Sequence, residues 1–226
     1  MKAGKKYLES LKKYDHAAFY DLKAALDLVK SLSCAKFDET VDLSVKVNLK
    51  KSQSVRDTVV LPNQFRGEKK VLVFCKAEKE KEAQDAGATY VGAEDLIEKI
   101  KGGWLGFDVA VATPDMMKDV GKLGMILGRK GLMPNPKTGT VTFDLKGALA
   151  ELKKGRVEFR ADKTGVVHLA VGKVSMESEK VAENVRAVVV EIKRKKPVDA
   201  KGEFVQTISV SSTMGPGVWV SLKDEE

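Results

Sequence analysis

The hydrophobic pattern of the predicted strands changes along the chain, and this change restricts the possible folds more than any other feature. Residues 40–49, TVDLSVKVNL, alternate between apolar and polar side chains, which predicts a strand with one buried and one solvated face. Residues 70–75, KVLVFC, form a continuous apolar run, as expected for a strand buried on both faces. Residues 107–114, FDVAVATP, indicate a second buried strand. The middle third is therefore expected to form a separate domain.

Predicted strands and helices alternate through this middle third. The expected order is strand 70–75, helix 78–87, strand 89–92, helix 93–103, strand 107–114 and helix 114–127. Glycines end the first two helices, and Pro114 occupies a favoured first-turn position of the third. Such alternation is typical of a small parallel sheet covered on both sides. We expect a three-layer, Rossmann-like α/β domain over residues 67–155.

The flanking thirds return to alternating strands. The predicted elements are helix 21–32, strand 40–49 with 55–61 as its plausible partner, a hairpin of 155–162 and 166–173, helix 178–197 and a long strand 203–222. Neither flank has enough elements to close a core alone. We therefore predict one discontinuous α+β domain from residues 1–66 and 156–226, split by the inserted domain, with hinges near 66–68 and 155. The alternative is three small independent units.

The charge balance favours an anionic partner. The chain has 226 residues and a net charge of +8, with 40 basic and 32 acidic side chains. Nucleic acid is the commonest partner of such a surface, and a generic solvated surface is the alternative. No apolar run is long enough for a membrane helix. The two cysteines have no metal-ligand spacing and suggest a reducing, cytoplasmic setting.

Residues 126–139, ILGRKGLMPNPKTG, combine glycines, prolines and cations. A phosphate-binding P-loop would need G-x-x-x-x-G-K-[ST], which does not occur. The string GRKG matches the G-x-x-G clamp of a KH domain, but the LMPNP that follows forbids the required helix. We favour a surface loop that contacts nucleic-acid backbone, and a purely structural turn is the alternative. The candidate contacts to RNA or tRNA are Lys122, Arg129, Lys130 and Lys137.

Other segments offer weaker candidates. Lys36 beside Phe37 is a minimal RNA-contact pair, although Phe37 could equally plug the core. Residues 215–217, Gly-Pro-Gly, interrupt the last strand and leave the hydroxyls of Ser211, Ser212 and Thr213 near the break. An edge-strand bulge would explain the same pattern. We find no catalytic constellation and no set of residues with metal-ligand spacing, so neither a metal nor a cofactor is expected.

Six segments, in the same order, resemble blocks of large-subunit ribosomal protein family one, whose members form the mobile stalk beside the tRNA exit site. They are AKFDETVDL (35–43), DAGATYVG (85–92), FDVAVATPDMM (107–117), ILGRKGLMPNPKTGTV (126–141), EFRADKTGVVHLAVGK (158–173) and SSTMGPGV (211–218). The resemblance spans nearly the whole chain. It implies two hinged domains, of which the split one makes the main contacts with ribosomal RNA.

The resemblance also implies individual residues. The implied RNA-binding residues are Lys36, Phe37, Thr40, Asp162, Lys163, Thr164, Gly165, His168, Thr213, Met214 and Gly215. The expected partners are large-subunit ribosomal RNA, exit-site tRNA and the mRNA of the protein's own operon, which it would repress. We expect a cytoplasmic protein, monomeric when free, that is not an enzyme and has no membrane partner. A nucleotide-dependent enzyme is the rival, but FCKAEKE after the first buried strand contains no glycine.

Overall fold

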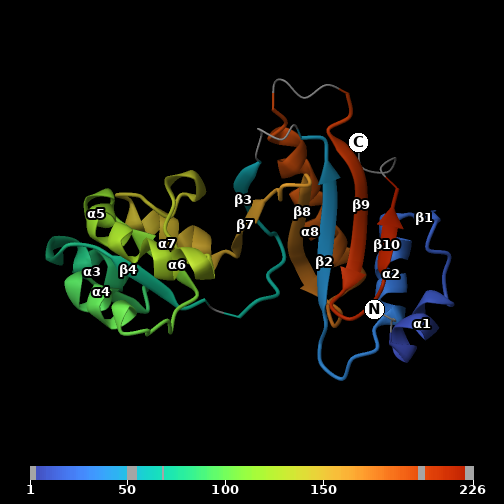
Figure 1. The fold of residues 1–226 in the computed structure, drawn as a ribbon, viewed down its shortest axis with the longest axis horizontal. Helices are drawn as coiled ribbons and strands as arrows, with labels where there is room; N and C mark the ends of the chain where they lie inside the picture. Colours follow the sequence, from blue (N-terminus) through green and yellow to red (C-terminus); the bar gives the residue numbers. More distant parts are fainter. Residues whose placement is uncertain (1–3, 50–54, 68, 198–201, 222–226) are drawn as a thin grey trace. The chain divides into compact units, whose positions relative to one another are not determined.

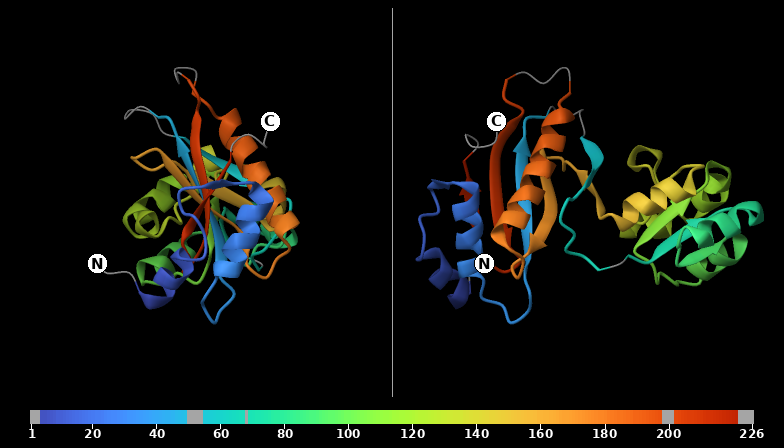
Figure 2. Two further views of the ribbon diagram at one scale, coloured as in Figure 1. Left: turned by 90° about the vertical axis from the view of Figure 1, so that its right-hand side faces the viewer. Right: turned by 180° about the vertical axis from the view of Figure 1, so that it is seen from behind.

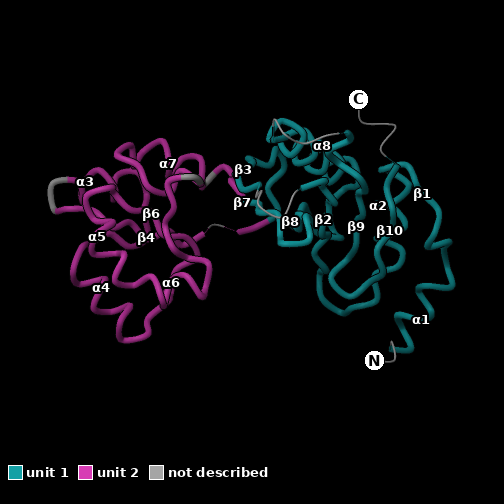
Figure 3. The backbone as a smooth tube through the Cα atoms, turned by 45° about the horizontal axis from the view of Figure 1, so that its top comes forward, with its two compact units in different colours: residues 1–65, 158–226 teal, residues 66–157 magenta. Residues whose placement is uncertain are grey.

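The structure, a computed structural model, describes residues 4–49, 55–67, 69–197 and 202–221. The chain divides into two compact units. Met1–Phe65 and Glu158–Glu226 form unit 1, and Arg66–Val157 form unit 2 (Figure 3). These bounds differ by one or two residues from the predicted ones. Whether each unit folds on its own stays a prediction.

Unit 1 contains a five-stranded sheet in the order β1-β10-β9-β2-β8. Its strands are β1 Phe19–Tyr20, β2 Thr40–Val47, β8 Val166–Lys173, β9 Val205–Ser212 and β10 Gly217–Val220. All neighbours pair antiparallel except β1 and β10, which are parallel. The predicted alternation of β2 is confirmed, because Val41, Leu43, Val45 and Val47 are buried and the residues between them are half-buried.

Two helices cover one face of this sheet. Helix α2 Leu22–Leu32 and helix α8 Ser178–Arg194 lie behind the strands in Figure 1 and in front of them in the right panel of Figure 2. Their buried residues recur at helical spacing, from Leu22 to Leu32 and from Val181 to Ile192. The short helix α1 Lys5–Leu11 precedes β1. The opposite face of the sheet carries no helix among the described residues.

Two predicted strand pairings are wrong. Residues 55–61 do contain a strand, β3 Arg56–Val60, but it pairs with β7 Arg156–Arg160 and not with β2. Strand β7 consequently does not form the predicted hairpin with β8. A tight turn does connect them, with Gly165 N–H donating to the Asp162 carbonyl, and one isolated bridge joins Ala161 to Val167. Beyond this bridge the two strands enter different sheets.

The predicted strand 203–222 is also corrected. The chain reverses between β9 and β10, and the two strands pair with Gly217 opposite Ser211 and Val220 opposite Ile208. Residues 213–216 are therefore the turn of a hairpin. A two-residue period continues on both sides of such a turn, so alternation alone does not reveal the reversal.

Unit 2 contains a three-stranded parallel sheet in the order β5-β4-β6. Its strands are β4 Val71–Phe74, β5 Tyr90–Gly92 and β6 Val109–Ala112, and every residue of β4 is buried. One face packs against α4 Glu94–Lys101 and the helical turns after β6. The other face packs against α3 Ala77–Asp85 and α7 Leu145–Lys153, a helix that was not predicted. Three layers result.

The predicted helix 114–127 is broken into four short pieces. They are the 3₁₀ turn η1 Pro114–Met116, helix α5 Met117–Val120, the 3₁₀ turn η2 Gly121–Leu123 and helix α6 Gly124–Lys130. Glycine is a poor residue for a helix interior, and Gly121 and Gly124 lie at two of the junctions. A further 3₁₀ turn, η3, covers Pro136–Thr138.

The mixed α/β character of the prediction is confirmed by these sheets and helices. Among the described helices, none combines the length and the apolar composition that a membrane span requires.

Candidate nucleic-acid interface

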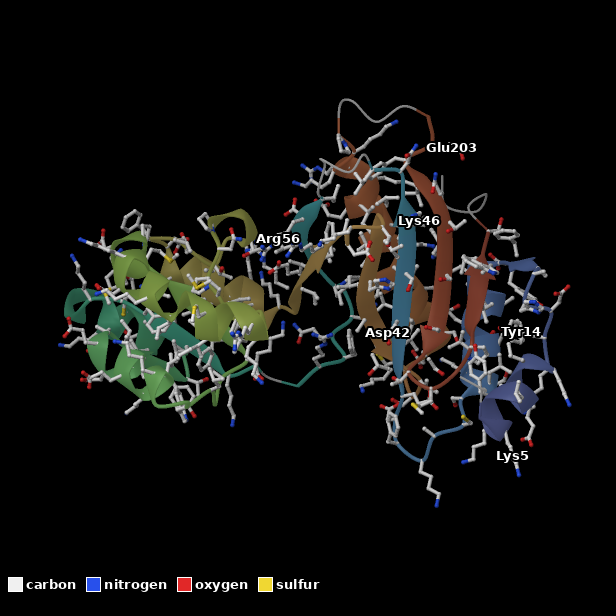
Figure 4. The ribbon with its side chains drawn as sticks, in the orientation of Figure 1. Lys5, Tyr14, Asp42, Lys46, Arg56 and Glu203 are labelled. Carbon is white, nitrogen blue, oxygen red and sulfur yellow. The ribbon has the colours of Figure 1, made fainter. Side chains whose placement is uncertain are left out.

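The uncovered face of the unit 1 sheet presents small polar side chains. On β2 this face carries Asp42, Ser44 and Lys46, and Figure 4 labels Asp42 and Lys46. Cross-strand register places His168 and Ser209 on either side of Ser44. Short side chains keep the surface flat, so a ligand can approach the backbone closely.

One buried carboxylate connects the two loops at one end of this sheet. Glu39 is 1% exposed. Its Oε1 accepts hydrogen bonds from the backbone N–H groups of Cys34 and Ala35, at 3.0 and 2.8 Å, and its Oε2 accepts one from Met214 at 3.1 Å. Burial alone would raise the pKa of Glu39, but the hydrogen bonds from these backbone groups lower it. The carboxylate is therefore held charged between residues 34–39 and 213–216.

A second connection joins the same loops through their threonines. The backbone N–H of Thr40 donates to Thr213 Oγ1 at 3.0 Å, and the Thr213 hydroxyl lies 3.3 Å from the Thr40 carbonyl, to which it donates. Lys173 Nζ donates to Thr40 Oγ1 at 2.8 Å. Thr213 is exposed and its hydroxyl joins two parts of the protein, and its contact with RNA stays a prediction.

These connections bring seven of the predicted residues to one end of the sheet. Phe37 and Met214 are each 57% exposed, so neither fills the core. Lys36 is also exposed. The seven residues are Lys36, Phe37, Thr40, Ser211, Thr213, Met214 and Gly215. The Lys36 cation, the Phe37 ring and the Met214 thioether thus lie at the same end of the sheet as the hydroxyls of Thr40, Ser211 and Thr213. We call the surface formed by these seven residues the Glu39 end.

Four of the remaining predicted residues, Asp162 to Gly165, form a turn at the other end of β2. Asp162 Oδ1 accepts hydrogen bonds from the backbone N–H groups of Val166 and Thr164, each at 2.8 Å, and from the Thr164 hydroxyl at 2.7 Å. These bonds lower the pKa of Asp162, the Val166 bond most. Lys163 is exposed at the tip. Gly165 N–H closes the turn by donating to the Asp162 carbonyl at 3.1 Å, and the Gly165 carbonyl connects the turn to β2 by accepting from Val47 N–H at 2.8 Å.

The two groups do not form one compact cluster. Strand β2 is eight residues long from Thr40 to Val47, so its two ends lie about 23 Å apart. His168 lies between the two ends, and its Nδ1 is 3.0 Å from Ser44 Oγ. No group of three or more potential metal ligands occurs among the described residues. The candidate interface is thus an elongated face with ordered loops at both ends.

Comparison with known proteins decides the family. The profile of the Ribosomal protein L1p/L10e family matches residues 29–216. The chain belongs to this family. It is 68% identical over 223 residues to Large ribosomal subunit protein uL1 of Treponema denticola, with 99% of both chains covered. It is 61% identical to the protein of that name from Treponema pallidum strain Nichols, over all of both chains, and 57% identical to that of Borreliella burgdorferi, over 98% of both.

Membership in this ribosomal protein family confirms the family recognised from the sequence blocks, and the expectation that the chain is not an enzyme. The ribonucleoprotein and RNA-binding character of the prediction follows from the same membership. The family match covers both loops of the Glu39 end and the turn at Asp162. It ends at residue 216, before Trp219.

In unit 2 of this family member, the predicted cationic loop is partly helical. Arg129 and Lys130 lie in the last turn of α6, where cations suit the helix dipole. Gly131, with φ 71°, ends that helix in the left-handed region. Lys122 forms an ion pair with Asp119 at 2.8 Å. The prediction of one continuous loop over 126–139 is therefore wrong for its first third. The side chain of Lys137 lies outside the described part of the structure.

The proline-containing segment that follows has an internal framework. Asn135 carbonyl accepts from the hydroxyls of Thr138 and Thr140, at 3.0 and 3.1 Å, and the Asn135 N–H donates to Thr140 Oγ1 at 2.7 Å. This pattern supports the alternative of a structural turn for residues 135–140. It leaves Arg129 and Lys130 as the exposed cations of the segment whose side chains are described.

The sequence analysis missed Glu39 as an organising residue. It lies inside the block AKFDETVDL, but a glutamate next to an aspartate before a strand gives no sign that one of the two is buried. The position of Glu39 gives the signal. It precedes the first residue of an alternating strand, so its side chain lies on the same face as the buried Val41 and Leu43. An acid on a buried face must be paired or hydrogen-bonded.

Proposed function

We propose that this protein binds a folded site in large-subunit ribosomal RNA through the uncovered face of the unit 1 sheet and the loops at its two ends. The assignment rests on family membership and on relatives named as large ribosomal subunit proteins. It places the protein on the cytoplasmic ribosome. The net charge of +8 agrees with a polyanionic partner.

The observation that carries the proposal is the Glu39 end. Residues 34–39 and 213–216 are held in fixed positions by one buried carboxylate and the Thr40–Thr213 hydrogen bonds. Fixed loops reduce the conformational entropy lost on binding. They present Phe37 and Met214 to solvent, where these side chains cover ribose or base surface.

The chemistry of the face suits RNA rather than duplex DNA. Folded RNA exposes 2′-hydroxyls in a wide, shallow minor groove. The serine hydroxyls of β2 and β9 and the imidazole of His168 can donate to and accept from such groups. Lys36 and Lys163, one at each end, lie where phosphates of the same backbone would pass.

Finer aspects of the function belong to the same proposal. We propose that the bound protein forms the mobile stalk beside the tRNA exit site and assists release of deacylated tRNA, with Arg129 and Lys130 of α6 facing the tRNA backbone. An mRNA of its own operon that mimics the rRNA site would occupy the same face and repress translation. Unit 1 would act as the split RNA-binding domain and unit 2 as the inserted one. The free protein would be a monomer.

Crosslinking provides the direct test. The full chain is incubated with fragments of large-subunit rRNA, irradiated, and the crosslinked peptides are mapped. We expect crosslinks within residues 34–40, 162–168 and 211–215. Binding should weaken linearly on a plot of log affinity against log salt, because phosphate contacts release counterions. Crosslinks confined to unit 2, or binding that does not respond to salt, would contradict the proposal.

A further inference from the structure

Two exposed aromatic residues lie at one edge of the unit 1 sheet, outside the predicted site. Phe19 is 63% exposed and Trp219 is 37% exposed. They are paired across β1 and β10, and their ring centroids are 6.4 Å apart with planes tilted by 42°. Neither ring belongs to the core of unit 1, because the buried residues of β10 are Val218 and Val220, on the other face.

This edge is well ordered by hydrogen bonds. Ser221 N–H donates to the Tyr20 carbonyl at 2.9 Å, which extends the parallel pairing of the two-residue strand β1. The Tyr14 hydroxyl donates to the Gly217 carbonyl at 2.9 Å, and Figure 4 shows Tyr14 beside β10. The Tyr20 hydroxyl accepts from Asp15 N–H at 3.2 Å. The rings therefore stand on a fixed framework, even though they are exposed.

The two rings continue the candidate interface without a break. Trp219 lies opposite Ser209, which lies opposite Ser44, which lies opposite His168. One row of side chains on the uncovered face thus runs from His168 through two serines to Trp219 and Phe19. Because Ser209 and Ser44 have short side chains, they leave room for a planar group to stack against Trp219.

The segment that leads into β1 carries an excess of positive charge, which suits an anion. Residues 4–18, which lead into β1, contain four lysines and two acidic residues. Lys12 and Lys13 are exposed and immediately precede Tyr14. An aromatic platform next to cations is the arrangement with which proteins hold unpaired nucleotides, the ring taking the base and the cations the phosphates.

We propose that Phe19 and Trp219 form a stacking platform for an unpaired nucleotide of the bound ribosomal RNA, adjacent to the folded site. This inference rests on the proposed function. Two rings provide far less apolar area than the roughly 1,200 Å² of a stable protein interface, which argues against a second copy of the chain as occupant. The platform extends the RNA-binding surface across all five strands.

Tryptophan fluorescence tests the platform without altering it. The chain has two tryptophans, and Trp104 belongs to unit 2, where it packs edge-on against Tyr90. Trp104→Phe keeps a ring there and leaves Trp219 as the sole tryptophan. The probe is the fragment of large-subunit rRNA that the protein protects from nuclease. We expect a base stacked on Trp219 to quench its emission. An unchanged emission on saturation with this RNA would overturn the platform.

Affinity measurements with matched variants give the second test. Trp219→Ala is expected to weaken binding of the protected fragment about tenfold, and Trp219→Tyr to restore most of it, because stacking tolerates any aromatic ring. Phe143→Ala is the control, since Phe143 is 56% exposed and lies in unit 2. Replacing the unpaired nucleotides of the fragment by abasic ones should abolish the difference between Trp219→Ala and the unsubstituted chain.

The outcomes separate the two proposals. If the unsubstituted chain protects no rRNA fragment, the proposed function itself fails. If it binds the fragment and Trp219→Ala binds equally well, only the platform fails. A Trp219-dependent dimer in sedimentation would also overturn the platform, because the rings would then serve contact between copies of the chain.

Discussion

The carboxylate of Glu39 accepts a hydrogen bond from the backbone N–H of Met214, 175 residues away in sequence. The same side chain binds the N–H groups of Cys34 and Ala35. One buried charge thus determines the geometry of both loops at the Glu39 end. Loss of this charge should disturb the loops together.

Glu39→Gln is expected to destabilise unit 1 and to weaken RNA binding. The amide keeps one acceptor oxygen but turns an NH₂ group toward backbone N–H donors, which leaves buried groups unpaired. Each unpaired group costs about 1–3 kcal/mol. Denaturant unfolding and RNA titration measure the two effects. Glu158→Gln is a suitable control, because that carboxylate pairs with Arg56 on a more exposed surface; equal losses in both variants would contradict the role given to Glu39.

Stability should fall in acid through Glu39. Its hydrogen bonds place the folded-state pKa below the ordinary value of 4.5. A group of this kind contributes stability that is fully present above the unfolded pKa and is lost as the pH falls through the lower folded pKa. We therefore expect the free energy of unfolding to drop below pH 4.5, and to drop less steeply in Glu39→Gln. Parallel pH profiles for the two proteins would show that other carboxylates are responsible.

Thr213→Val is expected to lose far more RNA affinity than Lys196→Ala. Valine keeps the shape of the side chain but removes both hydrogen bonds to the Thr40 backbone, so the loops of the Glu39 end lose one of their two connections. Lys196 Nζ donates to the Gly202 carbonyl at 3.1 Å, and Gly202 precedes β9, whereas the Glu39 end follows it. Gel-shift titration with an rRNA fragment compares the two. Small and equal losses would refute the assigned site.

Comparison of two glycines measures the energetic cost of the close contact between Gly165 and the Val47 carbonyl at the Asp162 turn. Gly165 and Gly202 have nearly equal φ values, 78° and 75°. A Cβ added to Gly165 would lie 2.7 Å from the Val47 carbonyl oxygen, whereas one added to Gly202 meets nothing within 4 Å. Gly202→Ala should therefore cost only the left-handed strain, about 1–2 kcal/mol, and Gly165→Ala clearly more. Thermal unfolding of both variants measures the difference, and equal shifts would exclude a steric role for Val47.

Removal of unit 2 tests whether unit 1 is a domain. Replacing residues 66–157 by a short glycine-rich linker should leave a folded protein that still binds the rRNA fragment, because the residues proposed to contact rRNA all lie in unit 1. Circular dichroism and gel shift are the measurements. The full chain carrying Arg129→Ala and Lys130→Ala should bind rRNA almost normally. An unfolded remnant would mean that the two units depend on each other.

Local patterns predicted most elements but not their partners. The alternation of β2, the buried run of β4 and the helical period of α2 each follow from neighbouring residues. Pairing of β3 with β7 joins residues about one hundred positions apart, and no local pattern specifies it. The alternation of β9 and β10 predicts one long strand, because a two-residue period continues across the turn between them. The Glu39 network likewise depends on contacts across the whole chain.

Interleaving of the two chain ends has a consequence for synthesis. Strand β1, near the start, completes its pairing only with β10, whose last residue is Val220. While the nascent polypeptide is still being made, the central unit has all its strands, but the outer sheet lacks its final two. The proposed RNA-binding surface is therefore complete only after β10 has been synthesised, and a translation product truncated before Gly217 would lack part of it.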